Sequence, residues 1–171
     1  MSENGGSARE GVAARGDVKI ERARTAGGQE GQDQKVRYSV SLGLSRWMAQ
    51  HGVSLALSSY QSGFLYFIGR NPRGGINIHQ TVLPKPMGLY MHGDELIMTG
   101  GAHVMRFRNA LESGHMVNGL FDVCYVPRVV HVTGGLDAHD VGVDANGEVI
   151  FVNTRFNCLA TVSGKYSFEE V

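Results

Sequence analysis

The chain lacks an excess of charge of either sign, because 16 Lys and Arg residues balance 16 Asp and Glu residues over its 171 residues. A balanced charge gives no field that recruits nucleic acid or an anionic membrane, so neither is expected as a partner. Long apolar runs are lacking too: residues 149–152 are a typical one, far short of the ~20 residues of a membrane-spanning helix. The N-terminus lacks the basic, apolar and small-residue pattern of a secretory signal, which predicts a cytoplasmic protein.

Cysteine is scarce. Cys124 and Cys158 are the two in the chain, and each lies in sequence that resembles a β-strand. They could pair across a sheet, but without a secretory signal the sequence favours reduced, buried thiols. The seven histidines form no HExxH motif, and the chain has no paired CxxC and no GxSxG. The common zinc and serine-hydrolase motifs are therefore absent.

Aromatic residues are missing from the first 37 positions, which hold seven glycines and mixed charges. Such a segment cannot bury enough apolar surface to offset the entropy lost on ordering it. The sequence therefore predicts a disordered tail over residues 1–37 and one folded domain over residues 38–171. A basic arm for nucleic acid is disfavoured, because seven Lys or Arg residues in the tail meet six Asp or Glu residues.

Glycine is abundant, with 24 residues, and beyond the tail it separates short apolar runs. This pattern is typical of all-β proteins with short strands and tight turns. One short helix precedes the strands, because Leu44, Trp47 and Met48 are spaced i, i+3 and i+4 and Gly52 can cap the C-terminal end. We expect Trp47 to pack on the sheet that follows.

Three segments then repeat one layout of three short strands. The strands are predicted at residues 53–58, 64–69 and 76–81, at 87–91, 95–100 and 103–107, and at 139–144, 148–153 and 158–163. The second and third units align through "GLYMHGDELIMTG" and "DVGVDANGEVIFVN", and residues 109–136 are interpreted as an insertion between them. Repeats of about 40–50 residues with several strands each are typical of β-propellers. The alternative is a sandwich or barrel of ordinary meander hairpins.

Three stretches, "VSLALSSYQSGFLYFIG", "MGLYMHGDELIMTGGAHVMRFRNAL" and "YVPRVVHVTGGLDAHDVGVDANGEVIFVNTRFNCLATVS", resemble one bacterial family. It is a conserved domain of unknown function, regarded as propeller-like, and the resemblance covers residues 44–168. It implies an all-β, propeller-like fold of three consecutive antiparallel units and no established activity. Members are typically about twice as long, and three units cannot close a propeller of four to eight blades. A truncated chain is the favoured explanation, and the alternatives are that two copies pair to complete a ring or that the isolated chain is poorly stable. An open sheet edge, and self-association through it, are therefore expected.

Polar residues gather at the start of the third unit and one hairpin later, at Asp137, His139, Asp140, Asn153 and Arg155. In propellers the first strand of each blade faces the central axis, where ligands bind, although this is an argument from fold analogy alone. His139, Asp140 and Asn153 are candidates to hold a divalent cation, which could polarise an ester or a lactone. The alternative is that Asp140 and Asn153 bond backbone groups and hold the turn.

Arg128 and Arg155 are the basic residues near this cluster in sequence. Paired guanidinium donors could clamp a carboxylate or phosphate, or the two residues could form ordinary surface salt bridges. Because no catalytic set is recognisable, the sequence favours a non-catalytic module that binds an unidentified small molecule or protein. The alternative function is a metal-assisted hydrolase that uses His139, Asp140 and Asn153.

Overall fold

The computed structural model describes residues 15–18, as backbone, and residues 38–171. Most of the predicted N-terminal tail lies outside the described residues. Its one described segment is strand β1 (Arg15–Val18), which pairs antiparallel with β2 (Tyr38–Ser41). The predicted helix is confirmed as α1 (Leu44–His51), and Gly52 caps it in the left-handed conformation at φ 61° with its N–H bonded to the Met48 carbonyl.

The packing of α1 differs from the expectation. Trp47 is 45% exposed and its ring lies 5.0 Å from that of His51, whereas Met48 is 1% exposed. A helix of two turns presents only a narrow stripe to its neighbour, and the stripe here is centred on Met48. The prediction that Trp47 packs on the sheet is therefore wrong.

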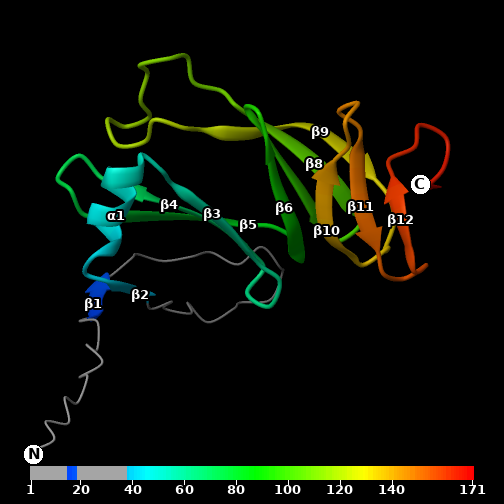
Figure 1. Cartoon of the computed structure of the whole chain (residues 1–171), viewed down its shortest axis with the longest axis horizontal. Coiled ribbons are helices and arrows are strands. Elements are labelled where there is room, and N and C mark those ends of the chain that lie inside the picture. Colours follow the sequence, from blue (N-terminus) through cyan, green and yellow to red (C-terminus); the bar gives the residue numbers. More distant parts are fainter. Residues whose placement is uncertain (1–14, 19–37) are drawn as a thin grey trace, which may run out of the picture.

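The remaining strands form three antiparallel sheets, each a meander in chain order (Figure 1). Sheet 1 contains β3 (Leu55–Ser59), β4 (Phe64–Arg70) and β5 (Ile76–Val82). Sheet 2 contains β6 (Pro86–His92), β7 (Glu95–Gly100), β8 (His103–Asn109) and β9 (Tyr125–Val132). Sheet 3 contains β10 (Ala138–Val143), β11 (Val149–Asn153), β12 (Cys158–Thr161) and β13 (Glu169–Glu170).

The mostly β class and the nine predicted strands are confirmed, with ends that differ by a few residues. The segment interpreted as an insertion is only partly one, because it contains β9, which pairs with β8 from Tyr125 to Val132. Pro127 within β9 argues against a strand in the sequence, but β9 is an edge strand, where a missing N–H donor is tolerated. The sheets of the described residues remain open and separate, so the barrel alternative is wrong.

Both cysteines are free and only half buried, contrary to the expectation of buried thiols. Cys158 begins β12, as expected for a strand residue. Cys124 lies just before β9, and its backbone N–H donates to Asn109 Oδ1 at 2.9 Å.

The sheets stack face to face, with sheet 2 in the middle (Figure 1). Every residue of β7 is buried, because alternate side chains point to opposite faces and both faces are covered. Leu96 and Met98 join Leu65 of sheet 1 in one apolar cluster, and Ile97 joins Phe151 of sheet 3 in another. The apolar run of β7 is thus explained by two neighbouring layers.

The face of sheet 1 that is turned away from sheet 2 is covered by the N-terminal elements. Helix α1 lies against β4, and Ser45 Oγ donates to the carbonyl of Gly74 in the β4–β5 turn. The rings of Tyr38 and Tyr66 lie 5.9 Å apart, and the Tyr38 hydroxyl donates to Gln80. Burial, together with the neighbouring Tyr66, raises the pKa of Tyr38 to about 12.

The first strands of the sheets lie side by side, β3 next to β6 and β6 next to β10. Both β6 and β10 contain a bulge, between Pro86 and Leu89 and between Ala138 and Val141 respectively. The buried Thr99 hydroxyl joins the two bulged strands. It accepts from the N–H of Gly88 at 2.9 Å and donates to the carbonyl of Ala138 at 2.7 Å.

Candidate functional site

The predicted residues at the start of the third unit lie at the start of β10. Asp137, His139 and Asp140 are exposed there. Asp140 Oδ1 accepts a hydrogen bond from the N–H of Val141 at 2.9 Å, within the bulge. The carbonyl of Asp137, a residue with a positive φ of 48°, accepts from Thr154 Oγ1 at 2.6 Å. The first bond fixes the backbone of the bulge in β10, and the second ties the residue before β10 to the β11–β12 turn.

Asn153 lies on the other side of the sheet. It is paired with the buried Ala138 across the β10–β11 ladder and is itself fully buried. His139 follows Ala138 within the bulge and is exposed, so its side chain lies on the solvent side rather than the buried side. Asn153 Oδ1 accepts from the N–H of Phe156 at 3.2 Å, and its Nδ2 has no hydrogen-bond partner among the described residues. The three metal-ligand candidates are therefore not brought together.

The two predicted arginines lie on different elements. Arg155 donates from Nη1 to the carbonyl of Gly135 at 3.2 Å, which ties the β11–β12 turn to the segment before β10. Arg128 is exposed on the edge strand β9. In the part of the chain that the structure describes, no group of three or more His, Cys, Asp or Glu side chains is arranged to hold a metal ion.

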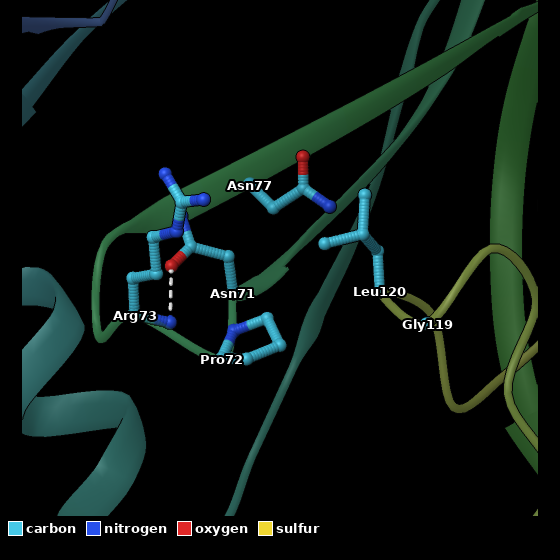
Figure 2. Close-up of a pocket in the computed structure, with 6 residues that line it drawn as sticks. All are labelled: Asn71, Pro72, Arg73, Asn77, Gly119 and Leu120. Carbon is cyan, nitrogen blue, oxygen red and sulfur yellow. Dashed lines mark hydrogen bonds between the residues drawn. The ribbon is translucent and has the colours of Figure 1, made fainter.

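A cavity of about 510 Å³ lies between the β4–β5 turn and the long β8–β9 loop. Figure 2 shows the residues that line it: Asn71, Pro72, Arg73, Asn77, Gly119 and Leu120. Asn71 Oδ1 accepts from the N–H of Arg73 at 2.9 Å and from that of Gly75 at 3.1 Å, so this side chain holds the turn. None of the predicted site residues lines the cavity. The sequence offered no motif for it, because the β4–β5 turn, the start of β5 and the distant β8–β9 loop form it together.

An apolar surface lies on the face of sheet 3 that is turned away from sheet 2, which we call the outer face of sheet 3. It carries Ile150 and Val152 of β11, their register partners Thr161 and Leu159 of β12, and Val171. Val152 is 37% exposed, Leu159 52% and Val171 67%. An apolar sheet face in contact with water is uncommon away from interaction sites.

The equivalent face of sheet 2 shows what such a surface looks like when it is covered. Leu89 pairs with Met98 directly after the β6 bulge, just as Val141 pairs with Phe151 directly after the β10 bulge. The matching positions are therefore Ile97 with Ile150, Thr99 with Val152, Val104 with Leu159 and Arg106 with Thr161. Sheet 3 buries Ile97, Thr99 and Val104 completely, whereas of their counterparts Ile150 is half-buried and Val152 and Leu159 are exposed.

Two carboxylates with lowered pKa values, those of Glu95 and Asp144, are held by hydrogen bonds or ion pairs within the fold. Glu95 accepts from Arg106 at 2.6 Å and from Arg108 at 2.8 Å. Burial by itself raises the pKa of Glu95, but the bonds from Arg108 and Arg106 outweigh it and lower the pKa below its ordinary value. In the β10–β11 turn, the backbone N–H of Glu148 and that of Asn146 bond the Asp144 carboxylate and lower its pKa. Neither group is poised for proton transfer at neutral pH.

These features define a β domain built of stacked antiparallel meanders, with an exposed apolar face on sheet 3. The chain belongs to the family described as a domain of unknown function (DUF4915), which matches residues 42–171. The resemblance to a conserved family without assigned activity is thereby confirmed, while a bacterial origin and truncation stay predictions. No curated protein and no solved structure matches the chain.

Among the described residues, no helix has the length and apolar character needed to cross a membrane.

Proposed function

We propose that the chain is a non-catalytic protein-interaction module of propeller-like architecture. Three meander sheets stack face to face, and β3, β6 and β10, the first strand of each, lie next to one another. Consecutive propeller blades have this arrangement, with their first strands nearest the axis. Sheets that are consecutive in the chain are also neighbours in the stack, which supports the propeller-like arrangement.

The observation that carries the interaction role is the outer face of sheet 3. Val152 and Leu159 are exposed at positions whose counterparts in sheet 2, Thr99 and Val104, are completely buried. Fully burying a side chain of this size from full exposure is favourable by about 1.5–3 kcal/mol. Val152 is 37% exposed and Leu159 52%, so covering them gains about 0.5–1.5 kcal/mol each. A partner that lays a flat apolar surface on this face gains that free energy.

The metal-assisted hydrolase alternative finds no support. Asn153 points to the buried face of sheet 3 and His139 to the opposite one, so a shared cation would have to be bound through the sheet. The bonds of Asp140 and Asn153 are instead those expected if both side chains hold backbone turns. No third carboxylate or imidazole of the described residues completes a metal site.

Photo-crosslinking tests the proposal in cells that express the full chain. A photoreactive amino acid replaces Val152 on the outer face of sheet 3, and in a matched control it replaces Val129, which is 42% exposed on β9. Position 152 is expected to give a discrete protein adduct on illumination, and position 129 is not. Equal or weaker crosslinking at position 152 would contradict the interaction role.

A further inference from the structure

We propose that the cavity between the β4–β5 turn and the β8–β9 loop binds a small molecule that carries a carboxylate or phosphate group on an apolar body. This cavity lies at sheet 1, at the other end of the stack from the outer face of sheet 3 (Figure 1). Binding here is therefore independent of the proposed interaction role. The charge, the hydrogen-bond donors and the fixed walls of the cavity each point to such a ligand.

Charge is unevenly divided along the described part of the chain, although the whole chain is neutral. Residues 38–93, which run from β2 to β6, contain four Lys or Arg residues and no Asp or Glu. Residues 94–171 contain ten Asp or Glu residues against five Lys or Arg. Strand β1 adds one residue of each sign, Arg15 and Asp17. The described charges on the β4–β5 side of the cavity therefore attract an anion.

Two side chains can donate hydrogen bonds to an oxyanion in the cavity. Arg73 presents a guanidinium from the turn, and Asn77 presents an amide from the start of β5 (Figure 2). Neither side chain has a hydrogen-bond or ion-pair partner among the described residues. The carboxylates of the β8–β9 loop, on Glu112 and Asp122, do not line the cavity. A guanidinium donates two parallel bonds to a carboxylate or phosphate, and the Asn77 amide can donate a third.

The rest of the lining favours an apolar body on the ligand. Pro72 lies on the turn side, and Leu120, which is 45% exposed, lies on the loop side. A volume of about 510 Å³ is within the ~300–1,000 Å³ of small-molecule sites, which combine apolar walls with a few polar groups. A bare inorganic ion would leave Pro72 and Leu120 in contact with water.

Both walls of the cavity are fixed by the chain's own hydrogen bonds. In the turn, the N–H of Asn71 donates to the carbonyl of Gly75 at 2.9 Å, in addition to the bonds that Asn71 Oδ1 accepts. In the loop, Val117 and Phe121 exchange backbone bonds at 2.8 and 3.1 Å. The Phe121 ring also lies 5.9 Å from the His79 ring of β5, which holds the loop on sheet 1. A preformed cavity of this kind costs a ligand little ordering free energy.

NMR titration of the isotope-labelled full chain with phenyl phosphate and with benzoate tests the proposal. At least one of these anions is expected to bind with a dissociation constant below about 1 mM and to shift the Gly119 backbone amide and the Asn77 side-chain amide. Benzyl alcohol has a similar size and no charge, and inorganic phosphate has no apolar body. Each is expected to bind at least about tenfold more weakly than the better aromatic anion.

Two pairs of variants locate the site without endangering the fold, because each substituted side chain is exposed. Arg73→Gln is expected to raise the dissociation constant at least about tenfold, since it removes a charged donor. Arg128→Gln, at an exposed arginine on β9, is expected to leave it unchanged. Leu120→Asp places a carboxylate on the cavity wall and is expected to weaken binding more than Leu120→Asn, which has nearly the same size and no charge.

Several results would overturn the proposal. These are no saturable shift with either aromatic anion, equally tight binding of benzyl alcohol or of inorganic phosphate, and unchanged binding by Arg73→Gln. Saturable shifts that map to the outer face of sheet 3 in place of the cavity would overturn it as well. The crosslinking result at position 152 has no bearing on this outcome, so the two proposals fail separately.

Discussion

The hydroxyl of Thr99 offers the sharpest test of how sheets 2 and 3 are joined. It is completely buried and serves two backbone groups, accepting from Gly88 N–H at 2.9 Å and donating to the Ala138 carbonyl at 2.7 Å. Both groups lie at bulges, where the strand ladder is locally disrupted. Thr99→Val removes the hydroxyl and keeps nearly the same volume, so it deletes these two bonds and leaves no cavity.

The expected loss follows from the two groups left behind. A buried N–H or carbonyl without a partner costs about 1–3 kcal/mol, so two of them together destabilise the fold by about 2–6 kcal/mol. Small domains unfold with only about 5–15 kcal/mol in total, which makes such a loss easy to measure. The decrease in the free energy of unfolding of Thr99→Val therefore reports on the contact between β6 and β10.

Urea titration of the full chain measures this loss as a lower midpoint with an unchanged slope. Thr99→Ser is the matched control, because it keeps the hydroxyl and removes one methyl group, at a cost of about 1 kcal/mol. A Thr99→Val protein within about 0.5 kcal/mol of wild type would refute the reasoning, since that difference is below the cost of one unpaired group. So would a Thr99→Ser protein less stable than Thr99→Val.

Three further changes test the fold. Gly88→Ala forces a Cβ to within 2.7 Å of the β10 backbone and is expected to lower the free energy of unfolding by about 1–3 kcal/mol. A Cβ on Gly142 meets nothing within 4 Å, so Gly142→Ala is expected to leave the free energy of unfolding unchanged in the same urea titration. Glu95→Gln is expected to be less stable than wild type at pH 7. Because the folded pKa of Glu95 is lowered, that difference should vanish as the pH falls from about 4.5 through the lower value, and a pH-independent difference would contradict the ion pairs. Met48→Ala is expected to lower the free energy of unfolding by about 2–5 kcal/mol, and Trp47→Ala by clearly less, because Met48 is buried and Trp47 is exposed. A larger loss for Trp47→Ala in thermal unfolding would show that Trp47, and not Met48, is the main contact of α1.

The strands could be predicted because their signals are local. Glycine turns bound short apolar runs, and the nine predicted strands match the observed ones closely. Strand β9 was missed because Pro127 weakens its pattern and its partner β8 lies across a long loop. The helix was predicted from its spacing, but that spacing does not decide whether Trp47 or Met48 points at the sheet.

The candidate site was predicted less well. Spacing placed His139, Asp140 and Asn153 near one another, and the strand pairing does bring Asn153 next to the start of β10. The register and the bulge then place Asn153 and His139 on opposite faces. That outcome depends on which residue of β11 pairs with Ala138, and a shift by one residue would have reversed it.

The amino-acid sequence by itself determined that the chain forms short antiparallel meanders, because turn residues and apolar alternation act over a few neighbouring positions. Only the tertiary structure decided the order in which the sheets stack, the covering of sheet 1 by α1, and the exposure of Val152 and Leu159. An apolar strand residue carries the same signal whether or not another layer covers it. Whether it is buried depends on whether a sheet or helix from another part of the chain packs over it.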